Sequence, residues 1–78
     1  MFKFSYKKNN FNELVSNLVL IKNNMYFAVI KLDTFEYSIK SLNDDSVALI
    51  DKGQSDSLTN AQREVRNQLT KLGANFNE

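Results

Sequence analysis

The sequence predicts a single α+β domain over residues 1–78, in which an antiparallel meander sheet has two helices packed on one face. The predicted order of elements is β-α-β-β-β-α. Segments near the N-terminus and in the middle of the chain alternate apolar and polar residues with the period of two that is typical of strands. Segments 11–21 and 58–72 instead repeat apolar residues every three or four positions, as amphipathic helices do. A chain of this length has no room for a second core.

The N-terminal segment, residues 1–8, is expected to contain a strand. From Phe2 to Lys7, aromatic residues alternate strictly with Lys and Ser, and this pattern is typical of a strand with one apolar side. Asn9 and Asn10 then indicate a turn that leads into a helix, because Asn tolerates left-handed backbone and caps helices. The strand can pair with the meander at an edge of the sheet.

Segment 11–21 is predicted to be a helix. Its apolar residues have the i, i+3, i+4, i+7, i+8 spacing of one helix face: Phe11, Leu14, Val15, Leu18 and Val19. Glu13 lies in the first turn, where the helix dipole favours a carboxylate. The alternative is a strand at Leu18–Lys22 that pairs with the next segment through a turn at Asn23–Asn24, because short apolar runs are ambiguous. Asn-Asn suits a two-residue hairpin less well than Asn-Gly, so the helix is the preferred interpretation.

Residues 25–52 are predicted to form a three-stranded meander. Met25–Leu32 is apolar on both faces, which is typical of a central strand. After a tight turn at Asp33–Thr34, Phe35–Lys40 alternates as a half-buried strand does. A second turn at Asn43–Asp45 leads into the third strand, Val47–Asp51.

Residues 58–72 carry the clearest helical pattern of the chain. One narrow apolar stripe contains Leu58, Ala61, Val65, Leu69 and Leu72. Ser57 is expected to be the N-cap, Lys71 suits the C-terminal end of the dipole, and Gly73 lies where a left-handed C′ residue is expected. Residues 74–78 are expected to be a frayed tail, unless Phe76 folds back onto the core.

The composition argues against an enzyme. The chain has no His, Cys, Trp or Pro and only two Gly, so it lacks the commonest general base, a thiolate nucleophile and a phosphate-binding glycine loop. Asp44 and Asp45 are the only adjacent acidic pair; they could hold Mg²⁺, but Asp is also favoured in turns. We therefore expect no catalytic residue, no metal site and no cofactor.

The expected location is the cytoplasm. The absence of Cys fits a reducing compartment, and no apolar stretch typical of a signal peptide directly follows Met1. The longest apolar runs are far shorter than the roughly 20 residues of a membrane span, so we expect no membrane partner.

Nucleic acid is a weakly supported partner. Lys3, Lys7 and Lys8 are interleaved with aromatic residues, and stacking aromatics with nearby lysines commonly hold single strands. In the preferred interpretation, the aromatics face the core and the lysines are the solvent side of an edge strand, where Lys also opposes aggregation.

The predicted α-β-β-β-α order of residues 11–72 and the stretch Asn12–Val15 resemble double-stranded RNA-binding domains. The resemblance implies a similar fold. The chain departs from that family where the family contacts RNA, because Ser57–Ala61 has no Lys pair and the first loop between strands is reduced to Asp33–Thr34. The resemblance therefore does not extend to RNA binding.

A protein partner is favoured by the number of apolar faces. Two helices can cover one face of the sheet, and Met25, Phe27 and Val29 on one side of their strand then need a cover of their own. The first strand or Phe76 could supply it. Otherwise an exposed apolar patch marks an interface, and a homodimer is one solution.

The functional prediction is a small non-enzymatic protein that binds another protein. A phage or mobile-element inhibitor that sterically blocks a host complex is the most concrete form, since abundant Asn and Lys codons suggest an AT-rich genome. The alternatives are a nucleic-acid-binding module that uses the N-terminal strand and a self-assembling structural subunit. The predicted partner-binding residues are the anchors Tyr6, Tyr37 and Phe76 and the charged rim Lys3, Lys7, Lys8, Arg63 and Arg66.

Overall fold

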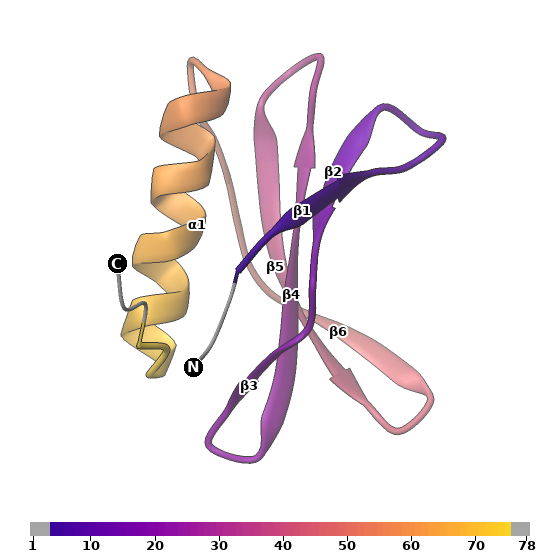
Figure 1. Cartoon of the computed structure of the whole chain (residues 1–78), viewed down its shortest axis with the longest axis vertical. Coiled ribbons are helices and arrows are strands. Elements are labelled where there is room, and N and C mark those ends of the chain that lie inside the picture. The colour runs from indigo at the N-terminus through magenta and orange to yellow at the C-terminus, as the bar shows by residue number, and fades with distance from the viewer. Residues whose placement is uncertain (1–3, 76–78) are drawn as a thin grey trace.

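The computed structural model describes residues 4–75, which form six antiparallel strands followed by one helix (Figure 1). The strands are β1 (Tyr6–Lys8), β2 (Glu13–Ser16), β3 (Val19–Ile21), β4 (Asn24–Lys31), β5 (Glu36–Asn43) and β6 (Ser46–Gln54), and the helix is α1 (Leu58–Leu72).

All six strands belong to one sheet with the order β1-β2-β4-β5-β6. β3 also pairs with β4, on the same side as β2 but at the other end: Val15 lies opposite Val29, and Val19 lies opposite Tyr26. β2 and β3 therefore behave as one strand that is interrupted at Asn17 and Leu18. With β2 and β3 counted as one strand, the sheet is a meander in which each strand pairs with the strand before it. Its edges are β6 on one side and β1 and the short β3 on the other.

The C-terminal helix has the bounds predicted for it. Ser57 is the N-cap, and its hydroxyl accepts a hydrogen bond from the Asn60 N–H at 3.2 Å. Gly73 ends the helix with a left-handed backbone (φ 119°), and its N–H donates to the Thr70 carbonyl. Glycine is favoured here because side chains rarely adopt that conformation.

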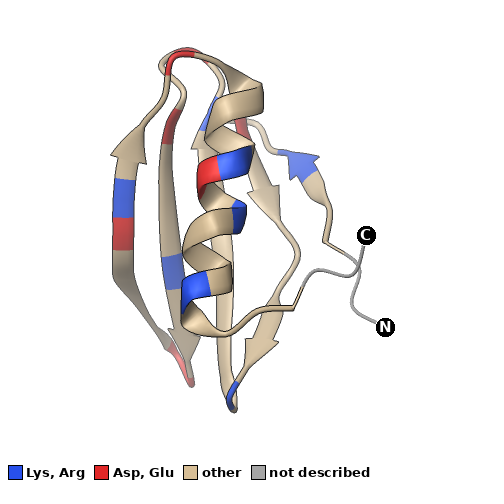
Figure 2. Cartoon of the chain, turned by 90° about the vertical axis from the view of Figure 1, so that its left-hand side faces the viewer, with Lys and Arg blue, Asp and Glu red and all other residues tan. Residues whose placement is uncertain are grey.

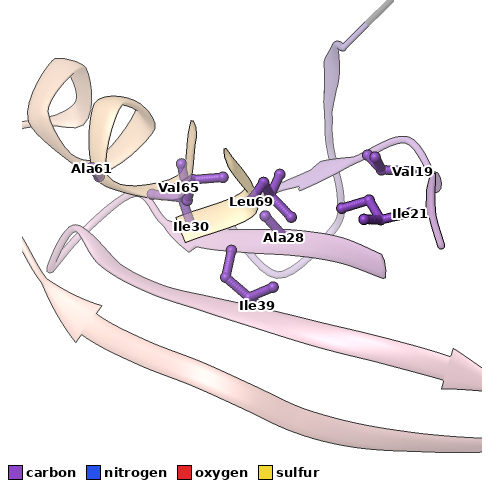
Figure 3. Packing of buried hydrophobic residues seen from close by; sticks show 8 residues of the cluster. All are labelled: Val19, Ile21, Ala28, Ile30, Ile39, Ala61, Val65 and Leu69. Atoms are coloured by element: carbon purple, nitrogen blue, oxygen red, sulfur yellow. The ribbon is translucent and has the colours of Figure 1, made fainter. Parts of the chain in front are cut away.

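The core lies between α1 and the two central strands, β4 and β5. Ala61, Val65 and Leu69 face the sheet (Figure 3), and the cluster is completed by Val19, Ile21, Ala28, Ile30 and Ile39. Each fully buried Leu, Ile or Val side chain contributes about 1.5–3 kcal/mol relative to exposure. The core is therefore one layer of side chains between one helix and one face of the sheet.

The predicted fold class is wrong in its second helix and in its β-α-β order. Segment 11–21 is not a helix: it contains the end of a turn, then β2 and β3. Asn12 has a left-handed backbone (φ 58°), and the Asn9 side-chain oxygen accepts hydrogen bonds from the N–H groups of Phe11 and Glu13. These bonds hold a turn where a helix would have begun.

Segment 11–21 forms strands instead of the predicted helix because it pairs with β4. Leu14 and Val15 lie opposite Ile30 and Val29, so the tertiary pairing overrides a helical spacing that a short apolar run cannot establish. The strand alternative at Leu18–Lys22 is the one that the structure supports. Its turn lies at Lys22 and Asn23, one residue before the expected place, and both have positive φ, as a type I′ hairpin turn requires.

The resemblance to double-stranded RNA-binding domains is lost with that helix. Asn12 lies in a turn and Glu13–Val15 lie in β2, so the described chain has no helix before the meander. The α-β-β-β-α order on which the resemblance rested is absent from residues 4–75.

The three predicted strands of the meander correspond to β4, β5 and β6, with β4 in the interior of the sheet as expected. β6 runs to Gln54, three residues beyond its predicted end, and has a bulge at Ile50, because Ile39 lies opposite Asp51 while Lys40 lies opposite Leu49. The N-terminal strand is reduced to β1, which pairs edge to edge with β2.

The break between β2 and β3 is held by a buried serine. The Ser16 hydroxyl accepts a hydrogen bond from the Ala28 N–H at 2.8 Å and donates to the Asn17 carbonyl at 3.0 Å. Its side chain thus satisfies a backbone group of β4 at the point where the strand pairing is interrupted. A buried N–H without a partner is costly.

We expect Ser16→Ala to lower the free energy of unfolding by about 1–3 kcal/mol, because the buried Ala28 N–H loses its acceptor. Urea denaturation measures this change. Ser46→Ala is the matched control: its exposed hydroxyl only donates to the Asn43 carbonyl, so the change should stay within about 0.5 kcal/mol. Equal effects of the two substitutions would contradict this role for Ser16.

Candidate protein-binding surface

Only one face of the sheet is covered by the described residues. α1 lies across one face, and nothing within residues 4–75 lies over the other, as Figures 1 and 2 show from two directions. We call this second side the open face. Its apolar members are Val15, Leu20, Met25, Phe27, Val29, Leu42, Val47 and Leu49.

The strand registers place these residues together. Val15 lies opposite Val29, Met25 lies opposite both Leu20 and Leu42, and Leu42 lies opposite Val47. Residues directly opposite one another in an antiparallel sheet share a face. The apolar side chains therefore continue across β2 to β6 without leaving the open face.

Exposure on this face increases toward its margins. Phe27, Val29 and Met25 on β4 are half-buried among their neighbours. Val47 and Leu49 on β6 are each 54% exposed, and Leu20 on β3 is 65% exposed. Large contiguous apolar surface of this kind is uncommon on monomeric proteins and marks interaction sites. The expectation that Met25, Phe27 and Val29 need a cover thus applies to this face, and β1 does not supply one, since it lies in the sheet.

Positive charge borders the apolar surface on the side of β5 and β6. Lys31 forms an ion pair with Glu36 at 3.6 Å, and Glu13 accepts a hydrogen bond from the Asn9 side chain. Lys40 and Lys52 have no ion pair within residues 4–75. They border a shallow hollow of about 310 Å³ whose lining includes Val29, Ser38 and Leu49. The open face thus combines an apolar centre with two unpaired lysines.

The lining of the hollow also includes the carboxylates of Glu13 and Glu36 and the hydroxyl of Ser38. No group of three or more acidic, His or Cys residues within residues 4–75 could hold a metal ion.

The two tyrosines predicted as anchors lie on the helix side of the sheet. Tyr6 packs against the core cluster and makes an edge-to-face contact with Phe4, with ring centroids 5.1 Å apart. Tyr37 lies opposite Gly53 and also packs against the core cluster. Phe76, the third predicted anchor, lies outside the described residues.

The predicted charged rim is divided between several parts of the molecule. Lys7 and Lys8 are exposed on the edge strand β1, where Lys7 lies opposite Val15 and so belongs to the open face. Arg63 and Arg66 are exposed on α1, on the opposite side of the sheet (Figure 2). Lys3 lies outside the described residues. The structure therefore divides the predicted charged rim between the two sides of the sheet, with Arg66 on the same side as the two tyrosines and near Tyr6.

The sequence interpretation did not single out the first half of β6 as a surface. Val47, Leu49 and Ile50 were assigned to a strand, and apolar residues on both sides suggest a central strand. β6 is an edge strand, however, and Ile50 is 44% exposed at the bulge. The available signal was the end position of this strand in the meander, because the last strand of a meander lies at an edge of the sheet.

Comparison of the chain with protein-family models, with curated proteins and with solved structures finds no match in any of the three. Among residues 4–75, no helix has the length and apolar character needed to cross a membrane.

Burial raises the pKa of Tyr6 to about 12, with the nearby positive charge of Arg66 partly opposing the rise. The phenol hydroxyl is buried and has no hydrogen-bond partner within the described residues. The unfolded phenol ionises near pH 10 while the folded one stays neutral, so the stability that Tyr6 contributes is present below pH 10 and is lost as the pH rises toward 12.

We expect Tyr6→Phe to leave stability at pH 7 unchanged or slightly higher, because it removes a buried hydroxyl without a partner. Between pH 10 and 12, wild type should lose stability relative to Tyr6→Phe. Urea denaturation across this pH range measures both effects, and the tyrosinate absorbance of wild type should contain one more late-titrating phenol than that of Tyr6→Phe. A parallel decline of the two proteins would rule out the role of Tyr6.

The Tyr37 ring lies over Gly53, its cross-strand neighbour. A Cβ atom at Gly53 would lie 2.6 Å from the Tyr37 Cζ atom, closer than such atoms approach. Burial raises the Tyr37 pKa, with further contributions from the carboxylates of Glu64 and Asp51. The ring is therefore held between β6 and α1, where it packs on the glycine instead of reaching outward.

We expect Gly53→Ala to lower the free energy of unfolding by about 1–3 kcal/mol, because the new methyl group displaces the Tyr37 ring. In a Tyr37→Ala background this cost should disappear, since the ring is gone. A double-mutant cycle by thermal denaturation measures the coupling. Additive effects of the two substitutions would show that the ring and the glycine are not coupled.

Proposed function

We propose that the chain is a non-enzymatic module that binds another protein through the open face. The observation that carries the proposal is the continuous apolar surface from Val15 to Leu49, which lies on the side of the sheet opposite α1. Burial of such a surface by a partner is favourable in proportion to the apolar area removed from water. The half-buried Phe27 near its centre has the size and position of a binding anchor.

Protein is the favoured partner because the open face is poor in stacking groups. Proteins that hold single-stranded nucleic acid use several exposed aromatic side chains. Phe27 is the one aromatic residue of the open face within residues 4–75, while Phe4 and Tyr6 pack against the core cluster. Phe4 and Tyr6 therefore do not form an exposed stacking platform with Lys7.

The mode of action in this proposal is occupation of a partner's surface. A module without catalytic groups can inhibit a larger complex by covering a site on it, and its small size suits that task. The composition, rich in Asn and Lys, favours a phage or mobile-element source and hence a host complex as the target.

Phe27→Ala tests the proposal. We expect proteins captured from a bacterial lysate by immobilised wild type to be depleted about tenfold or more on Phe27→Ala, because loss of a central anchor commonly costs 2 kcal/mol or more of binding energy. Quantitative mass spectrometry of the captured proteins measures the difference, and the unfolding midpoint shows that the variant is folded.

Phe11→Ala is the matched control, because Phe11 is 80% exposed in the β1–β2 turn and outside the open face. It should capture the same proteins as wild type. Equal capture by wild type and Phe27→Ala would contradict the proposal. Capture that nuclease treatment abolishes would favour the nucleic-acid alternative instead.

A further inference from the structure

We propose that the partner contributes an extended segment that pairs with the free edge of β6, with apolar side chains beside Val47 and Leu49 and a carboxylate beside Lys52. This inference rests on the proposed function and specifies the chemistry of the partner. It combines three features of the described residues: an unpaired strand edge, its apolar side chains and the unpaired lysines next to it.

β6 is the long free edge of the sheet. It has nine residues, pairs only with β5 and contains no proline. Alternate residues of such a strand turn their N–H and C=O groups away from the sheet, where an added strand can bond to them. The helix α1 packs on β4 and β5, and in Figure 1 the β5–β6 hairpin points away from it.

The first half of β6 lacks the features that protect most edges. Ser46–Ile50 carries no charge, and all five residues are exposed, with Val47 and Leu49 on the open face. Natural sheet edges are usually short, charged or covered, because an exposed apolar edge pairs with other strands. The bulge at Ile50 is the only irregularity along it.

The other edge of the sheet shows the contrast. β1 has three residues, and Lys7 and Lys8 are both exposed on it. A short edge strand with lysines is one of the ordinary protections against pairing. The edge at β1 is thus short and charged, whereas the edge at β6 is long and uncharged in its first half. This difference is expected if β6 binds a partner strand.

The charges beside β6 indicate what that strand carries. On the open face, Val47, Leu49 and Lys52 follow one another along β6, and Lys40 lies opposite Leu49 on β5. An added strand places its own side chains next to these, so two apolar residues and one carboxylate give complementary cross-strand pairs. The carboxylate would lie beside Lys52, with Lys40 one strand further into the sheet, and neither lysine has an ion pair within residues 4–75.

A second copy of this chain fits this edge less well. A two-fold axis perpendicular to the sheet, which relates antiparallel edge strands of two copies, places both open faces on the same side. The open face of β6 carries Val47, Leu49, Lys52 and Gln54, and Asp51 faces the helix side. In any register of such a pair, the second β6 brings no carboxylate to the open face, so Lys52 gains no opposite charge from it.

The test is a selection of random displayed peptides of about ten residues, the upper end of the usual strand length, against the immobilised full chain. We expect enrichment of sequences that alternate apolar and polar residues and that carry Asp or Glu on the apolar side. The best peptide, made synthetically, should lose affinity when alternate backbone amides are N-methylated, because pairing with an edge needs those N–H groups.

Reversal of the charge at Lys52 tests directly whether this lysine binds the peptide carboxylate. Lys52→Glu should weaken binding of the acidic peptide about tenfold or more, and exchange of the peptide carboxylate for Lys should restore it. Lys22→Glu, at an exposed lysine in the turn between β3 and β4, is the matched control and should leave binding unchanged. The unfolding midpoints of both variants show that they are folded.

The inference would be overturned if no peptide is enriched over an unrelated immobilised domain, or if the enriched peptides carry no carboxylate. It would also be overturned if neither N-methylation of the peptide nor Lys52→Glu changes the affinity. A dimer of the chain, seen by light scattering and dissociated by Val47→Lys, would overturn it as well. Nuclease-sensitive binding in place of peptide binding would also overturn it. If no peptide is enriched while Phe27→Ala still loses captured proteins, the strand inference fails and the proposed function stands. If both experiments fail, both proposals fail.

Discussion

The apolar contact between α1 and the two central strands is the interaction on which the rest of the structure depends. Ala61, Val65 and Leu69 pack on Ile30 and Ile39, all of them fully buried. A helix is about 10–12 Å across and neighbouring strands lie about 4.8 Å apart, so one helix covers about two strands. The sheet is five strands wide, since β2 and β3 share one position beside β4. The outer strand β6 therefore extends beyond the helix, and the open face is the side of the sheet that no described element covers.

The sequence predicted those elements in which local pattern and tertiary structure agree. The stripe of α1 and its caps Ser57 and Gly73 act within one helix, so their positions are encoded locally. β4 was assigned to the interior of the sheet because it is apolar on both sides, and it is there. The prediction of a helix at 11–21 was wrong because the spacing of its apolar residues also fits two short strands. Pairing with β4 decides between helix and strands, and this pairing involves residues distant in sequence.

One wrong element changed the expected surface. With two helices on the sheet, Tyr6 and Tyr37 were reasonable anchors beside a charged rim, yet both rings pack against the core cluster. The apolar residues of β6 were correctly predicted to form a strand. The order of strands is a property of the whole sheet, however, so nothing within Val47–Ile50 shows that this strand lies at an edge. The hydrogen bond from the Ala28 N–H to the Ser16 hydroxyl, which holds the break between β2 and β3, could not be predicted from the sequence either. It depends on the register between β2 and β4, which places Ser16 beside Ala28.

The most direct test of the account is the solvent accessibility of methyl groups, measured by nuclear magnetic resonance with a soluble paramagnetic probe. Val47 and Leu49 are 54% exposed, whereas Ile30 and Ile39 are fully buried under α1. The account predicts strong relaxation by the probe at the methyl groups of Val47 and Leu49 and almost none at those of Ile30 and Ile39. Equal protection of all four residues in the isolated protein would show that the open face is already covered and would contradict the account.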